Sequence, residues 1–345
     1  MVGDNVGAVD GLVDRFGRRV TYLRLSVTDR CNFRCVYCMP AEGVKLCPSK
    51  DLLTFEEIRV VVETLASHGV RRVRVTGGEP LVRKQLPELI ASLKAIEGID
   101  EVVMTTNGYL LGRDAVALRE AGLDGLTVSL DSLQADRFSK MSRGGSLERV
   151  LESMELASQA GFERIKINAV VIRGFNDDEV LDMIEWSLER GHLLRLIEFM
   201  PIGADTFWSD GNDNGCVPAA EMQAVIGTRW AMEPLGMKTG AGPARYWGLK
   251  GPASPDGQGR VGIISAVTQC FCDSCNRIRL TPQGGLRACL ADDSEVDLRA
   301  VLRGGEGPEG VYKAVARSLW GKAESHSFDL EGGAVTMKQM VSIGG

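Results

Sequence analysis

The sequence predicts an α/β protein: a partial, TIM-like (β/α)6 barrel followed by a smaller α+β extension. Between residues 20 and 200, short runs rich in β-branched residues alternate with stretches of helical period. Such alternation is typical of a parallel sheet covered by helices. After residue 200 the alternation stops. Because six units are too few to close an eight-stranded barrel, we expect an open sheet with ligands at the carboxyl ends of its strands.

The expected strands are short and follow one another at regular intervals. They cover residues 21–28, 72–76, 101–106, 125–130, 164–171 and 193–199. The first helix is expected directly after Thr54, because Glu57 three residues later completes a capping box and apolar residues then recur at helical spacing. Further helices are expected over residues 85–96, 112–121, 146–160 and 177–190.

The chain divides into three predicted parts. Residues 1–19 form an N-terminal extension, residues 20–200 the partial barrel, and residues 201–345 a C-terminal region. The first sixty residues of that last region are rich in Gly, Pro, Asp and Trp, and we expect them to be surface elaboration with one helix near 218–226. Strands and a hairpin are expected around the cysteines that follow.

Composition limits the possible partners. The chain has 345 residues, 44% of them hydrophobic, and a net charge of −6. That length allows a large core, and the negative charge argues against nucleic acid or an anionic membrane as a partner. The sequence contains no apolar run of membrane-spanning length and its start lacks a signal-peptide pattern. We therefore expect a cytoplasmic protein.

The nine cysteines are unevenly distributed, which favours metal ligation over disulfides. Seven of them fall in two groups, at 31, 35 and 38 and at 270, 272, 275 and 289. A disulfide framework would spread its cysteines and would need an oxidising compartment. Cys47 and Cys216 stand alone, and we expect them to be incidental buried thiols.

The first group follows directly on the first expected strand, in the run CNFRCVYCMP. Cys31, Cys35 and Cys38 give the spacing C-x3-C-x2-C. A structural zinc site usually has four protein ligands. An iron–sulfur cubane held by three thiolates instead leaves one iron open to a substrate or cofactor. A three-cysteine zinc loop remains the alternative.

The second group is ambiguous from spacing alone. Cys272, Cys275 and Cys289 give C-x2-C-x13-C, a spacing that zinc ribbons also use. Cys270 is a fourth thiol that could complete a zinc site or close a cubane. A ligand only two residues from Cys272 would be difficult to wrap around the same cubane, so we expect three ligands there.

Basic residues within apolar strands indicate a polyanionic ligand. An isolated charge inside a barrel is costly to desolvate, and guanidinium groups suit phosphate oxygens. In the strand expected at 276–281 two arginines alternate with apolar residues and so face the same side. The basic residues of the set are Arg24, Arg74, Lys166, Arg195, Arg277 and Arg279. Exposure between helices is the alternative for any one of them.

Several runs together resemble one family of the radical S-adenosylmethionine (SAM) superfamily. The C-x3-C-x2-C loop followed by TGGEP at 76–80 is similar to the superfamily pattern. With MTTNG, VSLDSL and FCDSCNRIRLTPQGGLRACL, the match narrows to the GTP 3′,8-cyclase family of molybdenum cofactor biosynthesis. The resemblance extends from about residue 15 to the C-terminal Gly-Gly.

The resemblance implies two [4Fe–4S] clusters, SAM and GTP as ligands. By this similarity the first cluster, which cleaves SAM to a 5′-deoxyadenosyl radical, is held by Cys31, Cys35 and Cys38. The second, whose open iron binds guanine, is held by Cys272, Cys275 and Cys289. The positions matching the SAM site are Tyr37, Gly78, Ser129 and Met200. Those matching the GTP site are Arg24, Arg74, Thr105, Lys166, Arg195, Arg277 and Arg279, with Arg24 also expected to assist proton delivery.

The resemblance also implies partners and a role for the tail. Gly344 and Gly345 look like the family's tail that reaches the active site, while ordinary fraying is the alternative. A flavodoxin- or ferredoxin-like electron donor, a downstream cyclic pyranopterin monophosphate synthase and a homodimer are the expected associations. Two other hypotheses stay open at this point: a radical SAM peptide maturase, and a zinc- or cluster-binding regulator without catalysis.

Overall fold

A computed structural model of the chain describes residues 11–203, 215–235, 242–328, 336 and 338–344. Its organising element is a sheet in which the described strands follow the order β12-β11-β10-β1-β2-β3-β4-β5-β6-β9-β8-β7. The first six strands in the chain are parallel neighbours. They are β1 (Tyr22–Ser26), β2 (Arg72–Thr76), β3 (Glu101–Thr106), β4 (Gly125–Ser129), β5 (Lys166–Val171) and β6 (Leu193–Glu198).

Strands from the C-terminal part of the chain extend this sheet at both edges. On one side β10 pairs in parallel with β1, and on the other β9 pairs in parallel with β6. Antiparallel strands complete each edge. The bounds are β7 (Ala231–Pro234), β8 (Arg245–Gly251), β9 (Ser254–Ile264), β10 (Arg277–Leu280), β11 (Gly285–Arg287) and β12 (Val296–Asp297).

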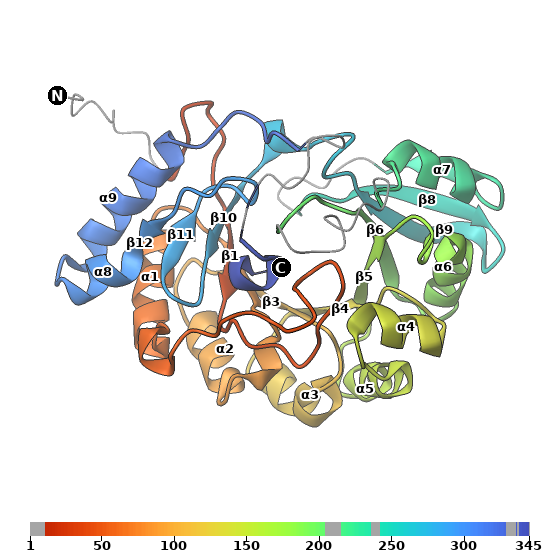
Figure 1. The fold of residues 1–345 in the computed structure, drawn as a ribbon, viewed down its shortest axis with the longest axis horizontal. Coiled ribbons are helices and arrows are strands. Elements are labelled where there is room, and N and C mark those ends of the chain that lie inside the picture. The colour runs from red at the N-terminus through yellow and green to blue at the C-terminus, as the bar shows by residue number, and fades with distance from the viewer. Residues whose placement is uncertain (1–10, 204–214, 236–241, 329–335, 337, 345) are drawn as a thin grey trace.

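The helices lie outside the curved sheet, as Figure 1 shows. They bury their apolar faces in one main core against the outward-facing strand residues, such as Leu23, Val73 and Ile278, as expected for parallel βα units. Their bounds are α1 (Phe55–Ser67), α2 (Leu86–Lys94), α3 (Leu111–Glu120), α4 (Ala135–Ser142), α5 (Leu147–Gln159), α6 (Val180–Glu189), α7 (Ala219–Gly227), α8 (Leu298–Arg303) and α9 (Gly307–Trp320).

The predicted α/β class with a C-terminal extension is confirmed. The strands expected at 72–76 and 101–106 match β2 and β3 to the residue. The capping box at the start of α1 forms, with the side chains of Thr54 and Glu57 each bonded to the other's backbone. The partial, TIM-like barrel form of the sheet stays a prediction. Helix α4 was not expected, because its eight residues carry a short pattern without a capping signal.

The expectation that residues 201–260 are surface elaboration is wrong for the described part. Strand β8 joins the main sheet through β9, and Met222, Trp230 and Leu249 are fully buried in the main core. The Gly and Pro content hid these strands, because a β-bulge and turns interrupt their alternation. Cys47 and Cys216 are buried free thiols, as expected. Among the helices described, none is both long and apolar enough to span a membrane.

Candidate functional site

A cavity of about 240 Å³ lies at the carboxyl ends of the parallel strands. The first cysteine loop, the end of β2 and the strand β10 all contribute to it. It is therefore bounded both by the βα units and by the C-terminal part of the chain. The residues expected to bind ligands that line it are Arg24, Cys31, Cys35, Tyr37, Cys38, Gly78, Thr105, Ser129, Met200, Arg277 and Arg279.

The loop that carries the first three cysteines is tied to the helical side of the fold. The Tyr37 hydroxyl donates a hydrogen bond of 2.7 Å to Asp131 Oδ2, just after β4. The backbone amides of Arg34 and Val36 donate to carbonyls near the end of α4, at 3.0 and 2.9 Å. Hydrogen bonds at Arg34, Val36 and Tyr37 thus hold this loop, and its three thiols line one cavity.

Burial dominates the electrostatics of these thiols. It raises the pKa of Cys31 to about 11 and that of Cys38 to about 12. The pKa of Cys35 is raised well above its usual range by burial and by the neighbouring Cys38. Cys31 and Cys38 both contribute to the raised pKa of Cys35, so the three thiols lie close together, and a bound cation would stabilise all three thiolates. The donor set therefore fits an iron–sulfur cluster.

The TGGEP segment packs against the start of the cysteine loop. A Cβ on Gly78 would lie 2.3 Å from the Arg30 carbonyl oxygen, so no side chain fits there. The amides of Gly78 and Glu79 donate to backbone carbonyls of the opposite segment at 2.7 and 2.8 Å. Glycine is needed because two backbone segments approach each other directly beside the cavity.

Glu79 is a fully buried carboxylate beside the first cysteine loop. It accepts hydrogen bonds from the Thr106 hydroxyl and the Asn107 amide, both at 2.7 Å, and from the Leu81 amide at 3.1 Å. Burial raises its pKa to about 7 even though these donors oppose the shift. Glu79 was not among the expected site residues, yet it links the ends of β2 and β3 below the cavity.

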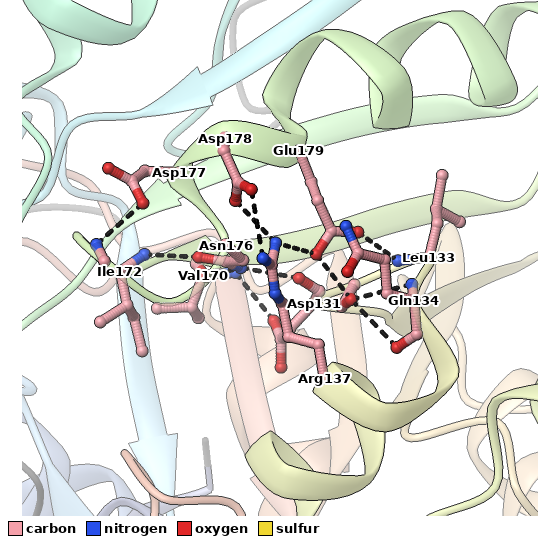
Figure 2. Close-up of polar contacts among 12 residues, drawn as sticks. Asp131, Leu133, Gln134, Arg137, Val170, Ile172, Asn176, Asp177, Asp178 and Glu179 are labelled. Atoms are coloured by element: carbon pink, nitrogen blue, oxygen red, sulfur yellow. Dashed lines mark hydrogen bonds and ion pairs between the residues drawn. The ribbon is translucent and has the colours of Figure 1, made fainter.

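A second network of buried hydrogen bonds joins the segments that follow β4 and β5 (Figure 2). Asp131 Oδ1 accepts from the Val170 amide at 2.9 Å, and burial raises the pKa of Asp131 to about 6. The Asn176 side chain donates to the Asp131 and Val170 carbonyls at 2.6 and 2.9 Å. Glu179 accepts from the Leu133 amide at 2.8 Å and pairs with Arg137 at 2.6 Å. The partner of Tyr37 is therefore rigidly placed.

The expected cations converge on the interior of the parallel strands. Arg74 Nη1 donates to Thr105 Oγ1 at 2.9 Å and to Thr127 Oγ1 at 3.0 Å. Arg195 Nη2 donates to the same Thr127 hydroxyl at 3.1 Å, and Arg74 Nε also bonds the Tyr22 hydroxyl. Arg74 and Arg195 are almost completely buried, which excludes the alternative that they face solvent.

Mutual repulsion shows in the pKa values of these cations. Burial, together with Arg195 and Arg74, lowers the pKa of Lys166 to about 8. Burial and Arg277 lower the pKa of Arg279 to about 10, and burial and Arg279 lower that of Arg24 well below its usual range. Several buried cations that destabilise one another favour an anion between them. The arrangement suits a ligand carrying several phosphates.

The C-terminal tail reaches this group. The Gly344 carbonyl accepts hydrogen bonds from Arg24 Nη2 at 3.1 Å and from Arg279 Nη1 at 3.3 Å. Met340, Val341 and Ile343 are buried just before it. Fraying is thus excluded for the described tail, and Figure 1 shows this end of the chain at the centre of the view. Gly345 lies outside the described residues.

The second cysteine loop lies between β9 and β10 and carries a different charge pattern. Arg277 and Lys322 lower the pKa of Cys275 to about 7 despite its burial. Burial, together with Cys270 and Cys275, raises the pKa of Cys272 to about 11. Cys289 and Cys275 both lie close enough to Arg279 to raise its pKa, against the larger lowering by burial and Arg277. The three expected ligands therefore lie in one neighbourhood, and the donor set fits a second cluster.

Cys270 is exposed and lies beside two other potential ligands. The ligand atoms of Cys270, Cys272 and His326 all lie within 4.8 Å of one another. The expected set of Cys272, Cys275 and Cys289 is not gathered as closely. A cubane spreads its thiolates further apart than a single ion does, so this spacing does not decide between the two sets.

Glu198 anchors the second loop to the parallel strands. This fully buried carboxylate at the end of β6 accepts from the Ala219 amide at 2.8 Å and from the Val267 and Thr268 amides at 2.7 and 2.9 Å. The Thr268 hydroxyl also donates to it. Sequence reasoning missed Glu198, Asp131 and Lys322. The only available signal was a charged residue at or after the end of an apolar run.

Comparisons with known proteins give consistent results. A model described as Radical SAM superfamily matches residues 25–187, and one described as Molybdenum Cofactor Synthesis C matches residues 192–328. A GTP 3′,8-cyclase of Pelotomaculum thermopropionicum is 46% identical over 333 residues, covering 96% of this chain and 99% of the relative. Another from Hydrogenovibrio crunogenus is 40% identical, covering 97% and 99%.

Similarity to solved structures extends only to the fold. The structure of Streptococcus suis SuiB superposes with a TM-score of 0.59 at 12% identity, over 81% of this chain and 63% of that one. The family expected from the sequence motifs is confirmed by the much closer relatives. With one cavity lined by three cysteines and by arginines from both parts of the sheet, this chain belongs to the GTP 3′,8-cyclase family of the radical SAM superfamily.

Proposed function

We propose that this chain converts GTP to (8S)-3′,8-cyclo-7,8-dihydroguanosine 5′-triphosphate, the first step of molybdenum cofactor biosynthesis. One observation carries the proposal: the three thiols of the first loop and the arginines Arg24, Arg277 and Arg279 line a single cavity. A radical generated at the thiol end would therefore arise beside a polyanion bound at the arginine end. The curated relatives carry the name of this activity.

The cofactors are SAM and two [4Fe–4S] clusters. Cys31, Cys35 and Cys38 would hold the first cluster, and Cys272, Cys275 and Cys289 the second. When bound, the first cluster and SAM supply the 5′-deoxyadenosyl radical that removes a hydrogen atom. For SAM we propose contacts from Tyr37, Gly78, Ser129 and Met200, which line the thiol end of the cavity.

The cations would orient GTP. Arg74, Lys166 and Arg195 form a buried positive region under the cavity, supported by hydroxyls such as that of Thr105. We propose that they bind the triphosphate, so that the ribose C3′–H lies toward the thiol end and the guanine toward the second cluster. Fixing the substrate at both ends limits a short-lived radical to one C–H bond.

Arg24 and the tail would act at the ribose. Arg24 of β1 lies beside Arg279 of β10, its partner in the sheet, and lines the same cavity as the three thiols. After C3′ bonds to C8, one electron and one proton complete a product that is an isomer of GTP. We propose that Arg24 assists delivery of this proton and that Gly344 holds Arg24 and Arg279 in place.

The proposal extends to the location, the partners and the domain division of the chain. We propose that the chain works in the cytoplasm, takes electrons from a flavodoxin- or ferredoxin-like donor and passes its product to a cyclic pyranopterin monophosphate synthase. A homodimer is the assembly to test. We also keep the division into residues 1–19, 20–200 and 201–345, with the partial barrel in the middle part and the second cluster in the last.

An anaerobic turnover assay tests the function. The reconstituted protein is incubated with SAM, dithionite and either GTP or ATP, and the products are separated by liquid chromatography and identified by mass spectrometry. We expect 5′-deoxyadenosine and a GTP isomer of altered retention with GTP, and neither above background with ATP. Formation of 5′-deoxyadenosine without a nucleotide product would show that the substrate is wrong, and peptides would then be tested. Bound zinc without sulfide would exclude the radical chemistry itself.

A further inference from the structure

Lys322 is a buried cation beside a proposed ligand of the second cluster. Its residue is only 2% exposed. Its Nζ donates to Cys275 Sγ at 3.4 Å and to the Arg277 carbonyl at 3.2 Å. Within the described part of the chain, the recorded contacts of Lys322 include no carboxylate. Because burying an uncompensated charge is costly, this ammonium needs a negative partner, and the thiolate of Cys275 is the one within reach.

The segment that follows Lys322 is fixed to the same cysteine loop. Arg18 donates to the Ala323 and Glu324 carbonyls at 2.7 and 2.6 Å and to the Cys272 carbonyl at 3.0 Å. Arg18 is itself buried and paired with Asp14 at 2.5 Å. One guanidinium therefore joins the N-terminal segment, residues 323–324 and the second cysteine loop, and it keeps Lys322 from moving away.

The two cysteine loops have opposite electrostatic surroundings. At the first, neutral groups donate to Cys31 Sγ, the Phe33 amide at 3.4 Å and the Asn107 side-chain amide at 3.8 Å, and the buried carboxylate of Glu79 accepts from the Asn107 backbone amide. At the second, two cations donate to Cys275 Sγ, Lys322 Nζ at 3.4 Å and Arg277 Nη2 at 3.9 Å. The reduction potential of an iron–sulfur cluster depends on surrounding charge and on hydrogen bonds to its sulfurs. Positive charge favours the reduced form, because reduction adds one negative charge.

We propose that the fold gives the second cluster a higher reduction potential than the first, and that Lys322 is the positioning residue chiefly responsible. It acts through Cys275, holding the sulfur and placing a buried positive charge beside the cluster. Arg277 Nη2, 3.9 Å from the same sulfur, adds to this effect. The inference rests on the proposed function only in requiring that both clusters form. It predicts which cluster retains an electron when both compete for one.

The test is a redox titration of the full chain followed by electron paramagnetic resonance. SAM perturbs the signal of the first cluster and GTP that of the second, which assigns the two midpoints. The variants are Lys322→Met, which removes the charge at similar length, and Lys322→Arg, which keeps it. Lys313→Met is the matched control, because Lys313 is an exposed lysine on α9 that pairs with Glu309. Iron is counted in every sample.

We expect the second midpoint to lie above the first in the unmodified protein. It should fall in Lys322→Met, return toward its original value in Lys322→Arg and stay unchanged in Lys313→Met, while the first midpoint stays constant throughout. If Lys322→Met binds about four rather than about eight irons per chain and Lys322→Arg keeps about eight, Lys322 still acts through Cys275, which supports the proposal.

Three results would overturn it: a second midpoint at or below the first, an unchanged midpoint in Lys322→Met, or loss of the second cluster in both variants. Failure of the proposed function looks different, because the unmodified protein itself would then lack about eight irons or fail to respond to GTP.

Discussion

Glu198 offers the sharpest test of how the two parts of the sheet are joined. Its two carboxylate oxygens accept three backbone amide hydrogen bonds, from Ala219, Val267 and Thr268, and one from the Thr268 hydroxyl. Val267 and Thr268 lie in the first part of the second cysteine loop, and Cys272 follows four residues after Thr268. We expect Glu198→Gln to lower stability and to release that loop.

The magnitude follows from counting donors. In the better orientation the new amide group faces the Ala219 amide and the Thr268 hydroxyl. The hydroxyl can rotate to accept, so one buried N–H is left without a partner, which costs about 1–3 kcal/mol. The two bonds that remain at the other oxygen lose charge assistance, about 1 kcal/mol each, while relief from burying a charge offsets part of this. The expected loss is about 2–4 kcal/mol.

A thermal scan and an iron count measure the result. With an unfolding entropy of about 2.1 cal/mol/K per residue, 345 residues give about 0.7 kcal/mol/K. The apparent Tm should therefore fall by about 3–6 °C, and bound iron should fall toward four per chain while the SAM-responsive cluster survives. Glu233→Gln, at an exposed position of β7, is the control. Unchanged Tm with full iron in Glu198→Gln would refute the anchoring role.

Three further predictions address the ligand sites. Burial and neighbouring arginines lower the pKa of Lys166 to about 8, so Lys166 loses its proton as the pH rises through that value. The Kd for GTP should therefore rise by up to about tenfold per pH unit above pH 8. The same rise of Kd with pH in Lys166→Met would contradict this prediction. Gly78→Ala should weaken SAM binding, measured by calorimetry, by about 100-fold, because the added Cβ would lie 2.3 Å from the Arg30 carbonyl oxygen. Gly227→Ala is the control, because a Cβ on Gly227 would have no atom within 4 Å. Removing the last two residues should lower kcat about tenfold or more with little change in Tm, since Gly344 holds two arginines; normal turnover would argue against a catalytic role for the tail.

The parallel strands and the first cysteine loop could be predicted because their signals are local. An alternating run such as RVRVT marks a strand wherever it lies, and its two arginines, two residues apart, point to the same face. Arg74 then had to enter the interior, where it bonds Thr105 and Thr127. Spacing between cysteines is likewise a local property.

The partners of distant segments could not be predicted. Nothing in the alternation of NRIRLT specifies that β10 pairs in parallel with β1, more than two hundred residues earlier. The same holds for the Tyr37–Asp131 hydrogen bond and for the approach of Lys322 to Cys275. These contacts depend on chain crossovers that periodicity does not encode. The strands inside residues 201–260 were missed for a different reason, since bulges and glycines interrupt their pattern.

The most direct measurement of the central claim uses GTP deuterated at C3′. The reconstituted protein is given this substrate with SAM and dithionite under anaerobic conditions, and the mass of the 5′-deoxyadenosine formed is recorded. Hydrogen removal from C3′ predicts that 5′-deoxyadenosine gains one mass unit and that the cyclised nucleotide loses the deuterium. 5′-Deoxyadenosine of unchanged mass, beside GTP that keeps its deuterium, would contradict the account.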